Sequence, residues 1–77
     1  MAPNEKEVLA FFARLDQLAE KIKRLEEIAQ KTGNKDLLKQ TQSYHRLMNY
    51  SVLLGKRAKQ IMNGVEQDVD ETFVRMN

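Results

Sequence analysis

Residues 8–29 read VLAFFARLDQLAEKIKRLEEIA, and apolar side chains recur along this stretch at alternating spacings of three and four residues. Such spacing keeps them on one face of an α-helix, because about 3.6 residues complete a helical turn. The repeating positions are Val8, Phe11, Leu15, Leu18, Ile22, Leu25 and Ala29, with Phe12, Ala19 and Ile28 widening the stripe. The stretch predicts an amphipathic helix over 4–31, with Asn4 as its capping residue and Glu7 three positions later.

A stop signal, Thr32-Gly33-Asn34, follows this helix. Glycine adopts the left-handed conformation that ends helices, and asparagine can cap the next one. The alternation of four and three then resumes, which predicts a second helix over 34–64. Its stripe comprises Leu37, Thr41, Tyr44, Met48, Ser51, Gly55, Ala58, Met62 and Val65. Two helices of about 40 Å each, joined by a short loop, are typical of an antiparallel hairpin.

The C-terminal part of the chain is acidic. Asn63-Gly64 is a plausible stop, after which residues 65–77 are expected to form an acidic tail, a short third helix capped by Asp68, or a frayed extension of the second helix. The predicted fold is therefore all-α. It is a coiled-coil-like hairpin of two helices in a single domain, 1–77, with a short C-terminal helical segment.

The chain has 77 residues, no cysteine and one histidine, so neither disulfides nor a Cys/His zinc site can supplement its core. One seam between two helices buries too little apolar surface for a chain of this size. Residues 50–55 are apolar or small on almost every side of the predicted helix, and Ser51, Gly55 and Ala58 line its inner stripe with small side chains. The apolar stretch predicts a homodimer that forms a four-helix bundle, or docking onto another protein. The small side chains either leave room for a bulky residue such as Phe11 or Phe12, or permit a close helix crossing at a subunit interface.

Motifs of the common enzyme classes are missing from the sequence. It contains no glycine-rich phosphate loop, nucleophile elbow, HExxH motif or paired catalytic carboxylates. His45 has no carboxylate one helical turn away on its own helix to orient its ring, and Glu66, Asp68, Asp70 and Glu71 match no calcium loop. We expect a protein that is not an enzyme and that uses no cofactor or metal. With no secretory signal and no apolar run long enough for a membrane span, we also expect a cytoplasmic protein without a membrane partner.

Charge is distributed unevenly. Residues 1–31 carry six basic and six acidic side chains, residues 32–64 carry six and one, and residues 65–77 carry one and four. A ridge of basic and amide side chains is therefore expected along the outer face of the second helix. This ridge could merely keep the chain soluble, bind an acidic protein, bind phosphates, or attract the chain's own acidic tail.

The leading functional prediction is a non-enzymatic protein–protein interaction module: a homo-oligomeric helical hairpin that serves as an adaptor, assembly factor or inhibitor. Its expected binding residues are Arg46, Tyr50, Leu53 and Arg57, because tyrosine and arginine are favoured interface anchors and leucine adds apolar area. The alternative is a small nucleic-acid-binding regulator that uses the basic face of the second helix. Its expected binding residues are Lys35, Lys39, Arg46, Lys56, Arg57 and Lys59.

Overall fold

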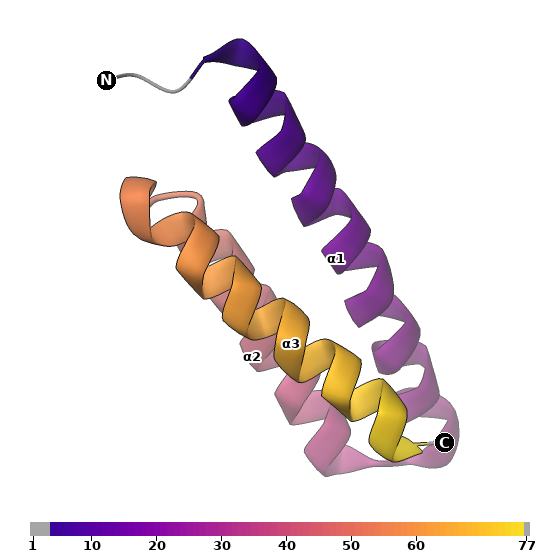
Figure 1. The fold of residues 1–77 in the computed structure, drawn as a ribbon. Coiled ribbons are helices and arrows are strands. Elements are labelled where there is room, and N and C mark those ends of the chain that lie inside the picture. The colour runs from indigo at the N-terminus through magenta and orange to yellow at the C-terminus, as the bar shows by residue number, and fades with distance from the viewer. Residues whose placement is uncertain (1–3, 77) are drawn as a thin grey trace.

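The computed structural model describes residues 4–76, and these residues form three α-helices and one short 3-10 helix (Figure 1). The elements are α1 (Glu5–Thr32), α2 (Lys35–Ser51), η1 (Gly55–Arg57) and α3 (Ala58–Met76). α2 runs back along α1, and the chain then reverses again, so that α3 runs in the same direction as α1. The described residues contain no strand, which confirms the all-α class.

The turn between α1 and α2 lies at the residues expected from the sequence. The Asn4 side chain accepts a hydrogen bond of 2.8 Å from the backbone N–H of Glu7, and α1 begins at Glu5. Gly33, at φ 66°, ends α1 in the left-handed conformation. The next residue, Asn34, caps the start of α2, because its side chain accepts a hydrogen bond of 3.0 Å from the backbone N–H of Leu37.

The predicted helix over 34–64 is wrong, because the chain reverses after Ser51. The N–H groups of Leu53 and Leu54 donate to carbonyls three residues earlier, at 3.0 and 3.1 Å, which tightens the backbone into a turn. Gly55 follows in the left-handed region at φ 54°. The spacing of buried residues does not reveal this break. Ser51 and Ala58 are both buried and lie seven residues apart, which is the interval that a continuous helix would also give. The molecule is therefore not a simple hairpin of two equal helices.

Two smaller expectations about glycines are also wrong. Gly55 lies in η1 and not inside a long helix, and neither Phe11 nor Phe12 fills the space above it, because a Cβ atom added to it would meet nothing within 4 Å in this chain. Gly64 does not end a helix, since α3 continues through it to Met76. Of the alternatives predicted for the C-terminal part, the third helix is the correct one for residues 65–76, although this helix begins earlier, at Ala58, and Asp68 lies inside it and is not its cap. Asn77 lies outside the described residues.

The core lies between the three helices and includes most of the predicted stripe. α3 covers faces of α1 and α2 that a two-helix hairpin would leave in water, and this packing explains how so short a chain buries a continuous core. Val8 and Gly55 depart from the stripe because both are exposed. The buried residues are Leu15, Leu18, Ile22, Leu25 and Ala29 in α1, Leu37, Thr41, Tyr44, Met48 and Ser51 in α2, and Ala58, Met62, Val65, Val69 and Thr72 in α3.

Alanine substitutions at two glycines test the chain reversal. Gly55→Ala is expected to lower the free energy of unfolding by about 1 kcal/mol, because an L-residue is strained at positive φ. Gly64→Ala is expected to raise it by about 1 kcal/mol, because alanine is the better helix former and the added Cβ meets no atom within 4 Å. Urea denaturation followed by circular dichroism measures both. Stabilisation by Gly55→Ala would instead indicate one continuous helix.

Candidate functional site

The four residues predicted to bind a partner lie on or near the second chain reversal. Arg46 and Tyr50 lie on α2, Leu53 lies in the turn, and Arg57 ends η1. All four are exposed, with 57% of Tyr50 and 79% of Leu53 accessible to solvent. Because the chain folds back here, Leu53 and Arg57 belong to the reversal and do not continue the helical face that carries Arg46 and Tyr50.

We call the end of the molecule that contains the α2–α3 turn and the start of α1 the distal end; the α1–α2 turn lies at the opposite end (Figure 1). Nine large apolar residues are exposed in the described part of the chain, and seven of them belong to this end. We define these seven as the distal surface: Val8, Leu9, Phe12, Leu47, Tyr50, Val52 and Leu53. Such a concentration marks an interaction surface more often than chance exposure.

The start of α1 projects past its neighbours. α1 has 28 residues, whereas α2 has 17 and α3 has 19, and Leu15 is the first buried residue of α1. Phe11 is half-buried against the core, and its ring meets that of Phe12 edge to face with centroids 5.7 Å apart. Phe12 is therefore held in a defined position although 46% of it is exposed. The distal surface is in part a preformed helical face.

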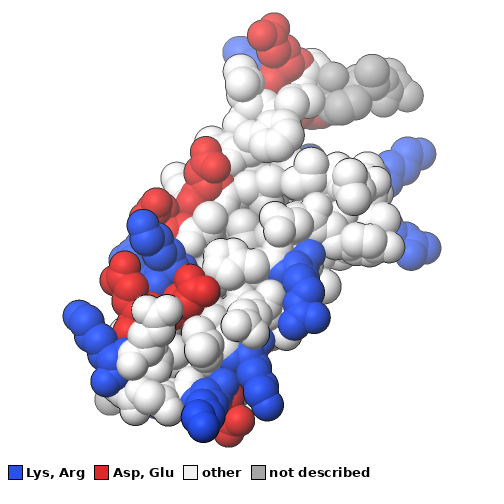
Figure 2. Space-filling view, turned by 180° about the vertical axis from the view of Figure 1, so that it is seen from behind, with Lys and Arg blue, Asp and Glu red and all other residues white. Residues whose placement is uncertain are grey.

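Positive charge borders the turn. No aspartate or glutamate occurs between Leu37 and Val65, while Lys56, Arg57 and Lys59 are all exposed beside the turn. Figure 2 shows an area without charged groups between the start of α1 and the turn, with basic groups at the edge formed by the turn. The start of α1 carries acidic residues instead. The distal end thus combines an apolar centre with charges of both signs at its rim.

The basic ridge expected along one helix is not continuous. Lys35 and Lys39 lie in the first turns of α2, next to the α1–α2 turn, whereas Lys56, Arg57 and Lys59 lie beyond the other end of α2. An α-helix of this length separates the two groups by about 25 Å. Arg46 lies between them. The six predicted nucleic-acid-binding residues therefore do not form a single cluster.

Two acidic side chains of α3, those of Glu66 and Asp70, pair with cations of α1. The Arg14 Nε lies 3.0 Å from a Glu66 carboxylate oxygen, and the Lys21 Nζ lies 3.3 Å from one of Asp70. Arg14 also contacts the amide of Asn63. The pairs are partly exposed, so each contributes at most about 1 kcal/mol, but together they align α3 along α1. These two carboxylates therefore pair with α1 and not with the basic residues of α2.

His45 has a partner that the sequence pattern did not reveal. Its Nε2 lies 3.7 Å from a carboxylate oxygen of Glu26, which α1 supplies across the seam with α2. This separation is longer than a hydrogen bond, and both side chains are partly exposed. Among residues 4–76, no three histidine, aspartate or glutamate side chains are grouped so as to hold a metal ion. We interpret the pair as a structural contact.

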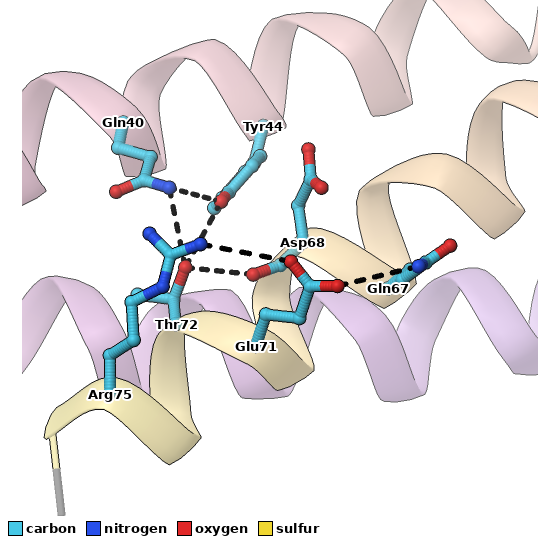
Figure 3. A network of polar contacts seen from close by, with 7 residues as sticks. All are labelled: Gln40, Tyr44, Gln67, Asp68, Glu71, Thr72 and Arg75. Atoms are coloured by element: carbon cyan, nitrogen blue, oxygen red, sulfur yellow. Dashed lines mark hydrogen bonds and ion pairs between the residues drawn. The ribbon is translucent and has the colours of Figure 1, made fainter.

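A polar network inside the bundle joins α2 to α3 (Figure 3). The Thr72 hydroxyl donates to the backbone carbonyl of Asp68 at 2.7 Å, accepts from the Gln40 side chain at 3.2 Å, and lies 3.3 Å from the Tyr44 hydroxyl. Gln40 also donates to Tyr44. Among the described residues no buried side-chain nitrogen or oxygen lacks a partner. A fully paired network of this kind sets the register of two helices.

Gln40 and Thr72 were not singled out by sequence reasoning. The available signal was weak: Thr72 continues the alternation of Val65 and Val69, so it could be placed on the buried face, but its partners come from another helix. The three side chains that join the helices, Gln40, Tyr44 and Thr72, are neutral, and they form hydrogen bonds with one another. It explains how the helices pair and offers no reacting group.

Comparison of the chain with family models, with curated proteins and with solved structures gave no match in any of the three. In the described residues, no helix has both the length and the apolar character that crossing a bilayer demands. The fold and the candidate site therefore define a class only: a small three-helix protein with an apolar, partly cationic end.

Proposed function

We propose that this chain is a non-enzymatic protein–protein interaction module that acts as an adaptor, assembly factor or inhibitor. The observation that carries the proposal is the gathering of seven exposed apolar residues at the distal end, beside exposed cations. Interfaces of folded proteins typically combine an apolar centre with a polar rim. The core cluster and the side chains packed against it include none of these seven, so their exposed parts are available to a partner.

The four predicted contact residues suit this purpose. Tyr50 offers a large, stiff ring and a hydroxyl, while Arg46 and Arg57 supply cations that can pair with carboxylates of a partner. Leu53, at the tip of the turn, is the most exposed large apolar residue of the described chain. The module is proposed to be homo-oligomeric as well.

We place the module in the cytoplasm. Small secreted domains commonly depend on disulfides, and this chain has no cysteine with which to form them.

A nucleic-acid-binding regulator is the second candidate. Lys56, Arg57 and Lys59 occur within four residues, in a stretch without acidic side chains, and such a group can contact phosphates. The two candidates differ in their response to salt. Binding through phosphates should weaken steeply as salt rises, whereas an interface with an apolar centre should weaken little.

Capture from host lysate tests the proposal. The tagged chain is expected to retain a specific protein, with or without nuclease, and mass spectrometry identifies it for reassembly from purified components. Tyr50→Ala/Leu53→Ser is expected to weaken the reassembled complex at least tenfold, because it removes the centre of the surface. Val74→Ser, at an exposed apolar position near the far end of α3, is the control and should change affinity less than twofold.

If nuclease releases everything that the chain captures, and if Lys56→Gln/Arg57→Gln/Lys59→Gln abolishes capture while Tyr50→Ala/Leu53→Ser leaves it intact, the nucleic-acid candidate replaces the proposal.

A further inference from the structure

We infer that a second copy of this chain occupies the distal surface, with the acidic start of α1 in each copy lying against the cationic α2–α3 turn of the other. The inference rests on the proposed function because it assumes that the distal surface is an interaction surface and names the partner that binds there.

The first step of the argument is the unsupported start of α1. Residues 5–10 are all exposed, and residues 5–14 precede the first buried position. Phe11 is the first side chain of α1 that packs against the core, so residues 5–10 extend the helix beyond its tertiary contacts within the chain. Apolar side chains nevertheless line this segment, at Val8, Leu9 and Phe12. A helix with an apolar face and no neighbour is expected to pack against another surface of the same kind.

The second step is the area available. Fully covering the seven side chains of the distal surface would bury roughly 700 Å² per copy, close to the ~800 Å² that each partner contributes to a standard interface. The apolar centre is therefore large enough for a specific dimer. Either half of it, the start of α1 or the turn, would be too small alone.

The third step is charge complementarity within one molecule. Glu5 and Glu7 lie at the start of α1, with Lys6 between them, so residues 5–10 have one net negative charge, while Arg14 further along pairs with Glu66. Lys56 and Arg57 lie in η1 beside the turn, and no acidic side chain is near them in sequence. In a twofold dimer any contact between two different segments occurs twice. Both acidic segments would thus meet a cationic turn.

The same charges argue against other occupants of the whole surface. An anionic membrane or a nucleic acid would attract the turn but would repel Glu5 and Glu7 on the adjoining segment. A second copy satisfies both segments together. Because Leu53 and Arg57 belong to this contact and to the proposed binding set, self-association and capture of another protein would compete.

Paired charge reversals test the inference. Sedimentation velocity over a dilution series is expected to show a reversible dimer of the unchanged chain. Glu5→Lys/Glu7→Lys and Lys56→Glu/Arg57→Glu should each weaken the dimer at least tenfold, because each variant faces like charge with like charge. An equimolar mixture of the two variants should restore dimers, since each acidic segment in the mixture again meets a cationic one.

Circular dichroism of the separate variants provides the structural control, because both should keep the helix content of the unchanged chain. A chain that remains monomeric up to about 1 mM overturns the inference. Only a dimer with a binding free energy weaker than ~4 kcal/mol would escape detection at that concentration. A dimer that is indifferent to both reversals, or a mixture that stays monomeric, also overturns the inference. Binding of the monomer to phosphatidylserine vesicles, with no dimer at any concentration, would assign the surface to lipid instead.

The lysate capture described above is independent of this result. A dimer with the expected mixing behaviour that captures no other protein would refute the proposed adaptor function and leave the inference intact. A monomer that captures a protein through Tyr50 and Leu53 would do the reverse.

Discussion

Val69→Asp is expected to unfold most of the chain at room temperature. Val69 is fully buried between α3 and its neighbours, and it belongs to the main core cluster. A carboxylate placed there would be buried among apolar side chains, so the substitution should cost about 4 kcal/mol or more. Small domains are seldom more stable than about 5 kcal/mol, which leaves little folded protein. Far-ultraviolet circular dichroism during thermal denaturation measures the loss.

Val74→Asp is the matched control for this prediction, because it makes the same change five residues later in α3 at a side chain that is 74% exposed. We expect the free energy of unfolding to change by no more than about 0.5 kcal/mol. Equal and small effects at both positions would mean that residues 65–77 are a solvated tail, and the three-helix arrangement would then be wrong.

Leu25→Ala is expected to lower the free energy of unfolding by about 3 kcal/mol, through lost apolar burial and the cavity left behind. Leu25 is fully buried in α1 and lies in the same core cluster as Val69. Leu53→Ala makes the identical change at the tip of the α2–α3 turn and should cost less than about 0.5 kcal/mol in a dilute sample. Urea denaturation of both variants separates core from surface.

An equal loss of stability in these two leucine variants would show that Leu53 packs within one chain. The distal surface would then be part of the core, and neither the proposed function nor the second copy could use it.

The candidate site was only partly predictable from the sequence. Tyr50 was expected at the surface because it lies outside the buried stripe, and Leu53 because it lies beside polar positions. Both residues are exposed. The pairing of Arg14 with Glu66 and of His45 with Glu26 could not be predicted, since each joins residues from different helices. A pattern along one helix contains no information about which neighbour will cover it.

The amino-acid sequence by itself determined the helical class, the buried face of each segment, and the first turn at Gly33. These follow from local causes: the spacing of apolar side chains, the capping asparagines and the freedom of glycine. Only the tertiary structure decided that the second segment is two helices and that α3 is part of the bundle. A seven-residue interval from Ser51 to Ala58 keeps both residues on the inner face whether the chain continues straight or turns back. The choice depends on the apolar surface that α3 buries against α1 and α2, and that gain comes from contacts between residues distant in the chain.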